Sequence, residues 1–418
     1  MLGVLALLGT LQGSAARDTI LISLDDAAQR AVSVSPLVEA ARGEVSRARG
    51  LRAESGWPFA GNPTVGYTRT RRRTTGLTTH DYDWTIAQEV EIAGQSFLRR
   101  GAASALTRAS VARVDDSRRL AALEARSTYV SLSVAEQRSV LADSAAAFAE
   151  RLAGFARRQF DAGEMNRLEL NAATLEGARA RSSADRTAAE REAARAELHR
   201  VLGIPGDSMI RTVALPSVPD LTWTSDSTLL AVARARRPDL LAALEIYGSA
   251  RRFATLAGRA LVPNLALSLN TGQEAGTDRL FGVGVGVSVP LFYRQQGAKG
   301  AATAELATAH AQTVALERRI VAELRTSTAA YTRAHSAERR FAADVLGAAI
   351  ENVALTEQAL REGEVSLTDV ILLRRTAIDA QLEYLDVLTT SYFAWFDLAA
   401  ALGGEPHDLP ALLRGMEP

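Results

Sequence analysis

Two stretches in the second half of the chain alternate apolar residues with small or polar ones, which is the period of a β-strand. In one of them, Phe281 to Val289, glycine or serine fills every second position. An apolar face of about 9 residues fits a membrane-spanning barrel strand, whereas alternating glycines would only weaken a strand of a soluble sheet. We therefore expect a lipid-facing surface made of Leu265, Leu267, Leu269, Phe281, Val283, Val285 and Val287.

Ala, Leu, Glu and Arg at helical spacing fill much of the remaining chain. No proline occurs between residue 95 and Pro205, and the one strong break in that run is near Gly163. The pattern predicts helices over residues 95–160 and 166–202. At 1.5 Å per residue the first would be about 99 Å long. Such a rod cannot bury its apolar stripe in a small core, so it must pair with other long helices.

The second half of the chain repeats the first. Gly163 returns as Gly363 and Gly203 returns as Gly403, both at an offset of 200 residues. The other predicted elements return in the same order: β-hairpins at 63–92 and 263–289, and long helices at 296–360 and 367–402. An offset that stays constant over so long a stretch indicates a duplication, in which each half is one copy of the same structural unit.

The duplication divides the chain into two repeats, residues 17–203 and 226–403. Residues 204–225, which contain three prolines, are expected to connect the repeats near the middle of the rod. Residues 404–418 form a short tail that we expect to be poorly ordered.

Each repeat begins with a helix ahead of its hairpin. Ser23 can cap the first of these helices, and Arg237-Pro238 predicts a kink or a restart in the other. In the first hairpin, the polar stretch Arg71 to Asp83 is expected to be an exposed loop. The arginine run inside it would be either solvated or in contact with anionic lipid headgroups.

The chain begins with an apolar stretch, Leu2 to Leu11, followed by small residues. This pattern is typical of a secretory signal, here residues 1–16, although a basic start is missing. A buried N-terminal helix is the alternative. No stretch reaches the ~18 to 20 apolar residues of a membrane-spanning helix, so any membrane-embedded part would consist of strands.

Composition excludes several kinds of site. The formal net charge is +0, so nothing favours a nucleic-acid partner, and without cysteine there is no disulfide or thiolate metal site. The five histidines are scattered without ligand spacing, so no metal site is expected. Because no nucleophile–base pair, phosphate loop or nucleotide motif is present, we expect no enzyme activity and no cofactor.

Four strands are too few to close a barrel, for which eight is about the minimum. Lipid does not tolerate open sheet edges, so the chain must pool strands with copies of itself. Two copies would give a nearly filled barrel of eight strands, whereas three would give twelve strands and a lumen. The predicted fold is therefore mostly α with a small membrane β part, assembled as a homotrimer.

The order of the elements resembles that of the outer membrane efflux protein family, the TolC-like export channels. The resemblance covers essentially the whole mature chain, through the two repeats and two matched helix turns. These turns are Phe160–Gly163, followed by Leu168–Leu170, and Leu360–Gly363, followed by Thr368–Val370. The segment Gln88–Gln95, which enters the first long helix, is similar to the heavy-metal efflux branch.

The resemblance implies an assembly and a location. The trimer would form a 12-stranded β-barrel in the outer membrane, continuous with an α-helical barrel in the periplasm. Its partners would be a periplasmic adaptor (membrane fusion) protein, an inner-membrane pump, for which the RND type is one option, and outer-membrane lipid. The cargo stays open among metal ions, drugs and small organic molecules.

The resemblance also assigns roles to residues at the helix turns. Gly163 and Gly363 end the long helices, where a residue with positive φ is needed. These turns, with Met165 and Val365, would form the tip on which the adaptor docks. Nearby, Glu169 and Asp369 could form an acidic ring at the pore entrance, or they could be solvated acids at helix N-termini.

Family members often lock this entrance with an arginine and a tyrosine at positions where this chain has Val365 and Leu360. The lock is therefore absent, or it is built from Arg167 or Arg361. The competing interpretation of the whole chain is a soluble periplasmic coiled-coil scaffold without channel activity, whose short strands would form a cap.

Overall fold

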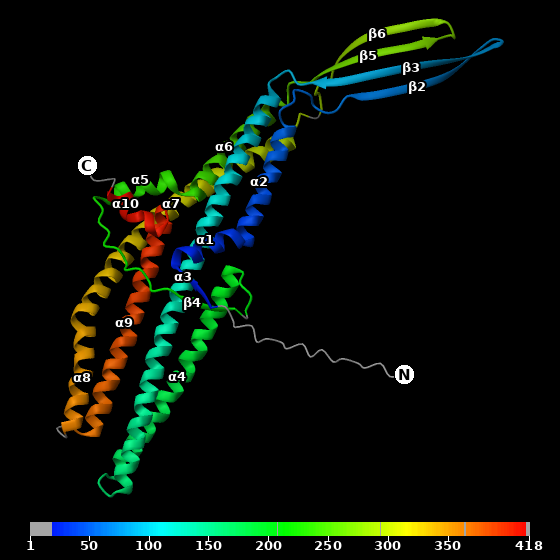
Figure 1. The fold of residues 1–418 in the computed structure, drawn as a ribbon. Helices are drawn as coiled ribbons and strands as arrows, with labels where there is room; N and C mark the ends of the chain where they lie inside the picture. The colour runs from blue at the N-terminus through cyan, green and yellow to red at the C-terminus, as the bar shows by residue number, and fades with distance from the viewer. Residues whose placement is uncertain (1–18, 207, 293, 363–364, 415–418) are drawn as a thin grey trace, which may run out of the picture.

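The computed structural model describes residues 19–206, 208–292, 294–362 and 365–414. Figure 1 shows an elongated molecule in which a β-sheet projects from one end of a set of long helices. The predicted signal, residues 1–16, lies outside the described residues, as does Gly363. Throughout the described ranges, every helix falls short of the length and apolar character that a membrane crossing requires.

The sheet at the end of the molecule contains four antiparallel strands, two from each repeat. β2 and β3 form the first hairpin, β5 and β6 form the second, and β3 pairs with β5 to join them. The strands are β2 (Thr64–Thr74), β3 (Leu77–Val90), β5 (Leu265–Glu274) and β6 (Asp278–Val287). The sheet therefore has two free edges, β2 and β6.

The loop expected at Arg71 to Asp83 is wrong, because both strands continue through it. Pairing persists up to Thr74 opposite Leu77, so the turn is only Thr75-Gly76, with Gly76 at φ +89°. A two-residue turn with positive φ matches the twist of the strands it joins. The stretch resembled a loop because both faces of the hairpin are polar here, so no apolar alternation marks the strands.

The helix α3 (Gln95–Asp161) runs along the rod as its spine, and other helices cover it in turn (Figure 1). Near its start, α2 (Pro36–Glu54) and α6 (Pro238–Arg259) pack against it, with Thr107 Oγ1 donating to Ala48 O at 3.3 Å and Ser249 Oγ donating to Ala102 O at 3.1 Å. Toward its end, α4 (Arg167–Leu202) takes their place. Shorter helices thus bury the apolar stripe of the long one in succession.

The second repeat has the same plan with one difference. α7 (Gln296–Phe341) packs against α6 and then against α9 (Leu367–Leu402). The single helix expected over 296–360 is wrong, because a π-helical segment, Ala342–Leu346, separates α7 from α8 (Gly347–Glu362). A π-helical turn holds about one residue more than an α-helical turn, and residue spacing alone did not indicate it.

Short elements surround the middle of the rod. Ser23 caps α1 (Leu24–Val34) through a capping box with Asp26, as the sequence predicted. The connector contributes β4 (Met209–Thr212), which pairs in parallel with β1 (Thr19–Ile22). At Arg237 the chain breaks between α5 (Asp226–Arg236) and α6.

The expectation of a poorly ordered tail is wrong for its described part. After Gly403, a short turn (Pro406–Asp408) leads into α10 (Leu409–Arg414). Leu409 and Leu413, one helical turn apart, are both buried in the main core. This apolar pair fixes the tail against the helices.

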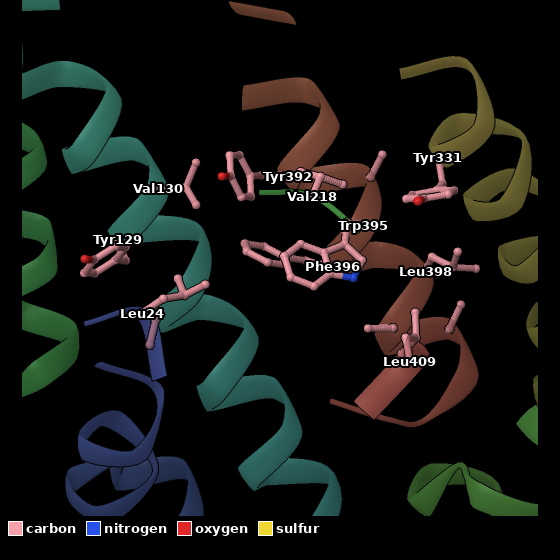
Figure 2. Packing of buried hydrophobic residues seen from close by; sticks show 14 of the residues in the cluster. Leu24, Tyr129, Val130, Val218, Tyr331, Tyr392, Trp395, Phe396, Leu398 and Leu409 are labelled. Carbon is pink, nitrogen blue, oxygen red and sulfur yellow. The ribbon is translucent and has the colours of Figure 1, made fainter. Parts of the chain in front are cut away.

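The main hydrophobic core lies in this middle region and joins both repeats. Figure 2 shows side chains of this cluster on α3, α7, α9, α10 and the connector, including Tyr129, Tyr331 and Phe396. Phe396 and Leu398 are fully buried on α9. The core therefore ties the two repeats into one unit at the middle of the rod.

Candidate functional site

One face of the four-stranded sheet is apolar and exposed. Residues that pair directly across strands share a face, so Val65, Ile86, Leu269 and Val283 form one row. Val283 is 71% exposed. Every residue predicted to face lipid lies on this face: Leu265, Leu267, Leu269, Phe281, Val283, Val285 and Val287. A continuous exposed apolar surface of this kind indicates contact with lipid or with another protein.

An aromatic row borders this apolar face at one end, and exposed aromatic residues lie in the segments that adjoin the other end of the strands. The row Tyr67, Trp84, Thr271 and Phe281 lies toward the hairpin turns, and the rings of Tyr67 and Trp84 are 4.8 Å apart. At the other end, Trp57, Phe97 and Phe292 are exposed. Aromatic girdles on both sides of an apolar band are characteristic of membrane barrels, and sequence spacing had indicated only the band itself.

The opposite face of the sheet is small and polar. Thr85, Asn270 and Gly282 lie in one row, and Ala87, Ser268 and Gly284 lie in the next. The glycines of β6 thus alternate with exposed valines, as the sequence predicted. A sheet with one apolar and one polar face separates lipid from an aqueous space.

The segment Gln88–Gln95, whose sequence is similar to the heavy-metal branch, forms the junction between β3 and α3. Glu91, whose side chain is only 7% exposed, pairs with Arg99 at 2.6 Å. Gln95 Oε1 accepts from Ala93 N at 2.8 Å, and Gly94 precedes the helix at φ +70°. These interactions join the strand to the helix.

The far end of the first helical hairpin is a compact turn. Gly163, at φ +78°, ends α3, and Glu164 N donates to Gln159 O at 2.8 Å. Met165 packs against a small cluster at this end with Phe160 and Leu170. In contrast, Leu168 on the first turn of α4 is 78% exposed. The tip therefore combines a rigid turn with one projecting apolar side chain.

The two predicted ring acids have equivalent structural roles. Glu169 and Asn166 form a capping box at the start of α4, with Asn166 Oδ1 accepting from Glu169 N at 2.9 Å. Asp369 and Ser366 form one at the start of α9, where Ser366 Oγ donates to Asp369 Oδ2 at 2.7 Å. The reciprocal hydrogen bonds satisfy free backbone N–H groups, so both acids have a structural role independent of any ring.

The remaining predicted tip residues are placed by the same elements. Arg167 is exposed on the first turn of α4, and Val365 is partly buried between α8 and α9. Arg361 belongs to the last turn of α8, but its side chain, like Gly363, lies outside what the structure describes. Within the described part of the chain, histidine, aspartate and glutamate form no group of three or more suited to a metal ion.

Sequence reasoning missed the contacts that join the two helical hairpins above their tips. The guanidinium of Arg374 on α9 lies over the ring of Phe148 on α3, 4.0 Å from its centroid. Arg138 on α3 also forms an ion pair with Asp386 on α9. These residues lie more than 200 positions apart, so helical periodicity within either segment carries no sign of the pairing.

Comparisons with known proteins agree with this architecture. Residues 229–404 match the family model described as outer membrane efflux protein. No curated protein sequence matches the chain. The matched family is one of outer-membrane channels, which agrees with the predicted location. The family match favours a channel over the competing interpretation, a soluble scaffold.

The fold is shared with solved channel structures of low sequence identity. The Campylobacter jejuni CmeC outer membrane channel superposes with a TM-score of 0.77 at 16% identity, over 91% of this chain and 85% of that one. The outer-membrane channel OprN gives 0.75 at 20% identity, over 92% and 90%. CusC gives 0.75 at 16% identity, over 95% and 96%. Residues 229–404 thus match the outer membrane efflux protein family, and the whole chain shares the fold of solved outer-membrane channels.

Proposed function

We propose that the protein is the outer-membrane channel of a tripartite efflux system. In this role it is a passive homotrimeric duct that receives cargo from an inner-membrane pump through a periplasmic adaptor. The observation that carries the proposal is the exposed apolar face on a sheet whose two edges, β2 and β6, are free. Because lipid does not tolerate free edges, three copies would close them into a barrel of twelve strands.

A matched pair of substitutions tests the membrane assignment. Val283→Arg places a charge on the apolar face, and Asn270→Arg places the same charge on the polar face, opposite Gly282. We expect Val283→Arg to abolish insertion, since an arginine costs roughly 2–4 kcal/mol at the lipid face, and Asn270→Arg to insert normally. Membrane fractionation and the mass of the detergent-solubilised protein give the result. A wild-type chain that stays monomeric and water-soluble without detergent would overturn the proposal.

The adaptor is proposed to dock at the helix tips, around Gly163, Met165, Gly363 and Val365. Supporting this is the projecting side chain of Leu168 beside a rigid turn. Because the chain contains no cysteine, a single cysteine at Met165, Leu168 or Val365 can be cross-linked without background. We expect adducts with the adaptor in cells that carry the pump, and none from Val140→Cys, an exposed control position on α3. Absence of adducts from all three tip positions would contradict docking there.

Glu169 and Asp369 are proposed to line the pore entrance as a ring of six carboxylates in the trimer, favouring cations. Their capping function can be separated from their charge, since glutamine and asparagine retain a side-chain oxygen. We expect Glu169→Gln combined with Asp369→Asn to reduce cation selectivity in planar bilayers while the helices stay folded. Glu190→Gln, an exposed acid farther along α4, is the control. Unchanged selectivity in the double variant would remove the ring.

Arg167 and Arg361 are the candidates for a lock at the entrance, replacing the arginine and tyrosine of other family members. If either holds the entrance closed, its replacement by alanine should raise the conductance of the isolated channel. Conductance equal to that of the wild type in both variants would exclude them.

The cargo is proposed to be set by the pump, with metal cations as one candidate beside drugs and small organic molecules. The metal option rests on the segment Gln88–Gln95 alone. Deletion of the gene followed by challenge with metals and antibiotics identifies the class. Increased sensitivity to antibiotics with unchanged metal tolerance would exclude metal export.

A further inference from the structure

Charge is sorted between the two faces of the strand ends. In β2, Arg69, Arg71 and Arg73 alternate with threonine or Arg72, so these three arginines share the face of Val65 and Tyr67. In β6, Arg279 lies on the same face as Phe281. All five acids of the four strands occupy the opposite face: Asp81, Asp83, Glu89, Glu274 and Asp278. Beyond the apolar part, the charged residues on this face are therefore all basic.

Arg72 provides an internal comparison. It points to the polar face, where it forms ion pairs with Asp81, at 2.8 Å, and with Glu274. By contrast, Arg69, Arg71, Arg73 and Arg279 are exposed, and within the described chain none of them forms an ion pair with a carboxylate. We call these four residues the arginine girdle. These four cations can therefore pair with anions from outside the chain.

The arginine girdle begins at a defined position along the strands, just beyond the aromatic row. Arg69 and Arg279 share a row with Tyr82 and Gln273, directly beyond the aromatic row of Tyr67, Trp84 and Phe281. At about 3.4 Å per strand residue, that row lies roughly 7 Å farther along the strand, and Arg71 and Arg73 lie farther still. Aromatic rows mark the boundary of the hydrocarbon region, so the girdle lies at headgroup depth.

We propose that the arginine girdle binds the phosphate groups of lipids in the outer leaflet. The proposal rests on the proposed outer-membrane channel, whose barrel would place β6 of one subunit beside β2 of the next. Arg279 and Arg69 of neighbouring subunits would then complete a continuous basic belt. Arginine holds phosphate through two parallel hydrogen bonds, which suits a phosphorylated glycolipid better than a zwitterionic lipid.

The test measures binding of lipid A to the purified trimer in zwitterionic detergent, by native mass spectrometry, with EDTA present to exclude cation bridges. The girdle variant replaces Arg69, Arg71, Arg73 and Arg279 by glutamine. Since one basic residue beside an anionic surface contributes roughly fivefold, we expect affinity for lipid A to fall at least about tenfold. Arg72→Gln, which changes the same residue type on the other face, should leave it unchanged.

Two further measurements separate the possible outcomes. Inorganic phosphate in excess should not displace lipid A, and full displacement would indicate a site for free phosphate and overturn the proposal. Conductance in bilayers of phosphatidylcholine tests the channel independently. If the girdle variant conducts and binds lipid A as the wild type does, the girdle assignment is wrong and the channel stands. A wild-type chain that neither assembles nor conducts contradicts both.

Discussion

Tyr129 and Tyr331 hold the connector between the repeats from two different long helices. The Tyr129 hydroxyl donates toward Val213 O at 2.8 Å, and the Tyr331 hydroxyl accepts from Leu221 N at 3.1 Å while contacting Pro219 O. The two tyrosines lie at nearly the same distance along α3 and α7. The duplicated unit thus uses equivalent positions to hold the segment that connects its two copies.

Removal of either hydroxyl should destabilise the middle of the rod. Tyr331→Phe leaves the buried N–H of Leu221 and the partly buried carbonyl of Pro219 without this partner, at a cost of about 1–3 kcal/mol. Tyr129→Phe should cost a similar amount. The measurement is denaturant unfolding followed by circular dichroism. Tyr247→Phe is the control, because in the described chain its hydroxyl makes no hydrogen bond; an equal loss there would contradict the assignment.

The same tyrosines predict a loss of stability in strong base. Burial raises the pKa of Tyr129 and of Tyr331 to about 12 each, against about 10 in an unfolded chain. Since the folded pKa is the higher one, the stabilisation is complete below pH ~10 and is lost as the pH rises toward ~12. Thermal unfolding across this window should show a falling melting temperature. The Tyr129→Phe, Tyr331→Phe double variant should show a shallower fall, and an identical slope would count against the prediction.

Two glycines with the same backbone conformation should respond differently to substitution. Gly163 and Gly403 both have positive φ, +78° and +72°, so alanine at either position costs roughly 1–2 kcal/mol. No atom lies within 4 Å of a Cβ added at Gly163, whereas one at Gly403 would lie 2.9 Å from the backbone N and Cα of Arg237. Gly403→Ala should therefore be clearly more destabilising in unfolding experiments. Equal losses would show that the contact relaxes without cost.

The two capping boxes predict local rather than global effects at the tips. Asn166→Ala and Ser366→Ala each remove one side-chain acceptor at a helix start, worth about 1 kcal/mol. Hydrogen exchange of the first-turn amides of α4 and α9 should accelerate, while that of the core around Phe396 stays unchanged. Slow exchange in both variants would mean that other contacts hold the helix starts.

The long helices and both hairpins could be predicted because their period persists over many residues and appears twice. The helix bounds at 95–160 and 166–202 differ from the observed ones by one residue at most. The apolar alternation of β6 likewise identified the exposed face, since side-chain direction in a strand follows from position alone.

The remaining features depend on contacts between distant segments. Thr19–Ile22 becomes a strand only because Met209–Thr212 lies beside it, and neither four-residue segment shows a pattern of its own. Leu409 and Leu413 order the tail only because a core is present to receive them. Arg69, Arg71 and Arg73 lie on the opposite face of the sheet from Arg72. This could not be predicted while the segment was expected to be a loop and not a strand.

The π-helical segment at Ala342–Leu346 affects any protein that binds the helix tips, at the end of the molecule opposite the sheet. The run from Gln296 to Glu362 begins and ends at the equivalents of α3, yet it is wound less tightly over that segment. Residues at equivalent sequence positions therefore point in different directions around the helix axis at the two tips. In the proposed trimer, a partner protein would meet two different tip surfaces on each subunit, so this end would present threefold and not sixfold symmetry.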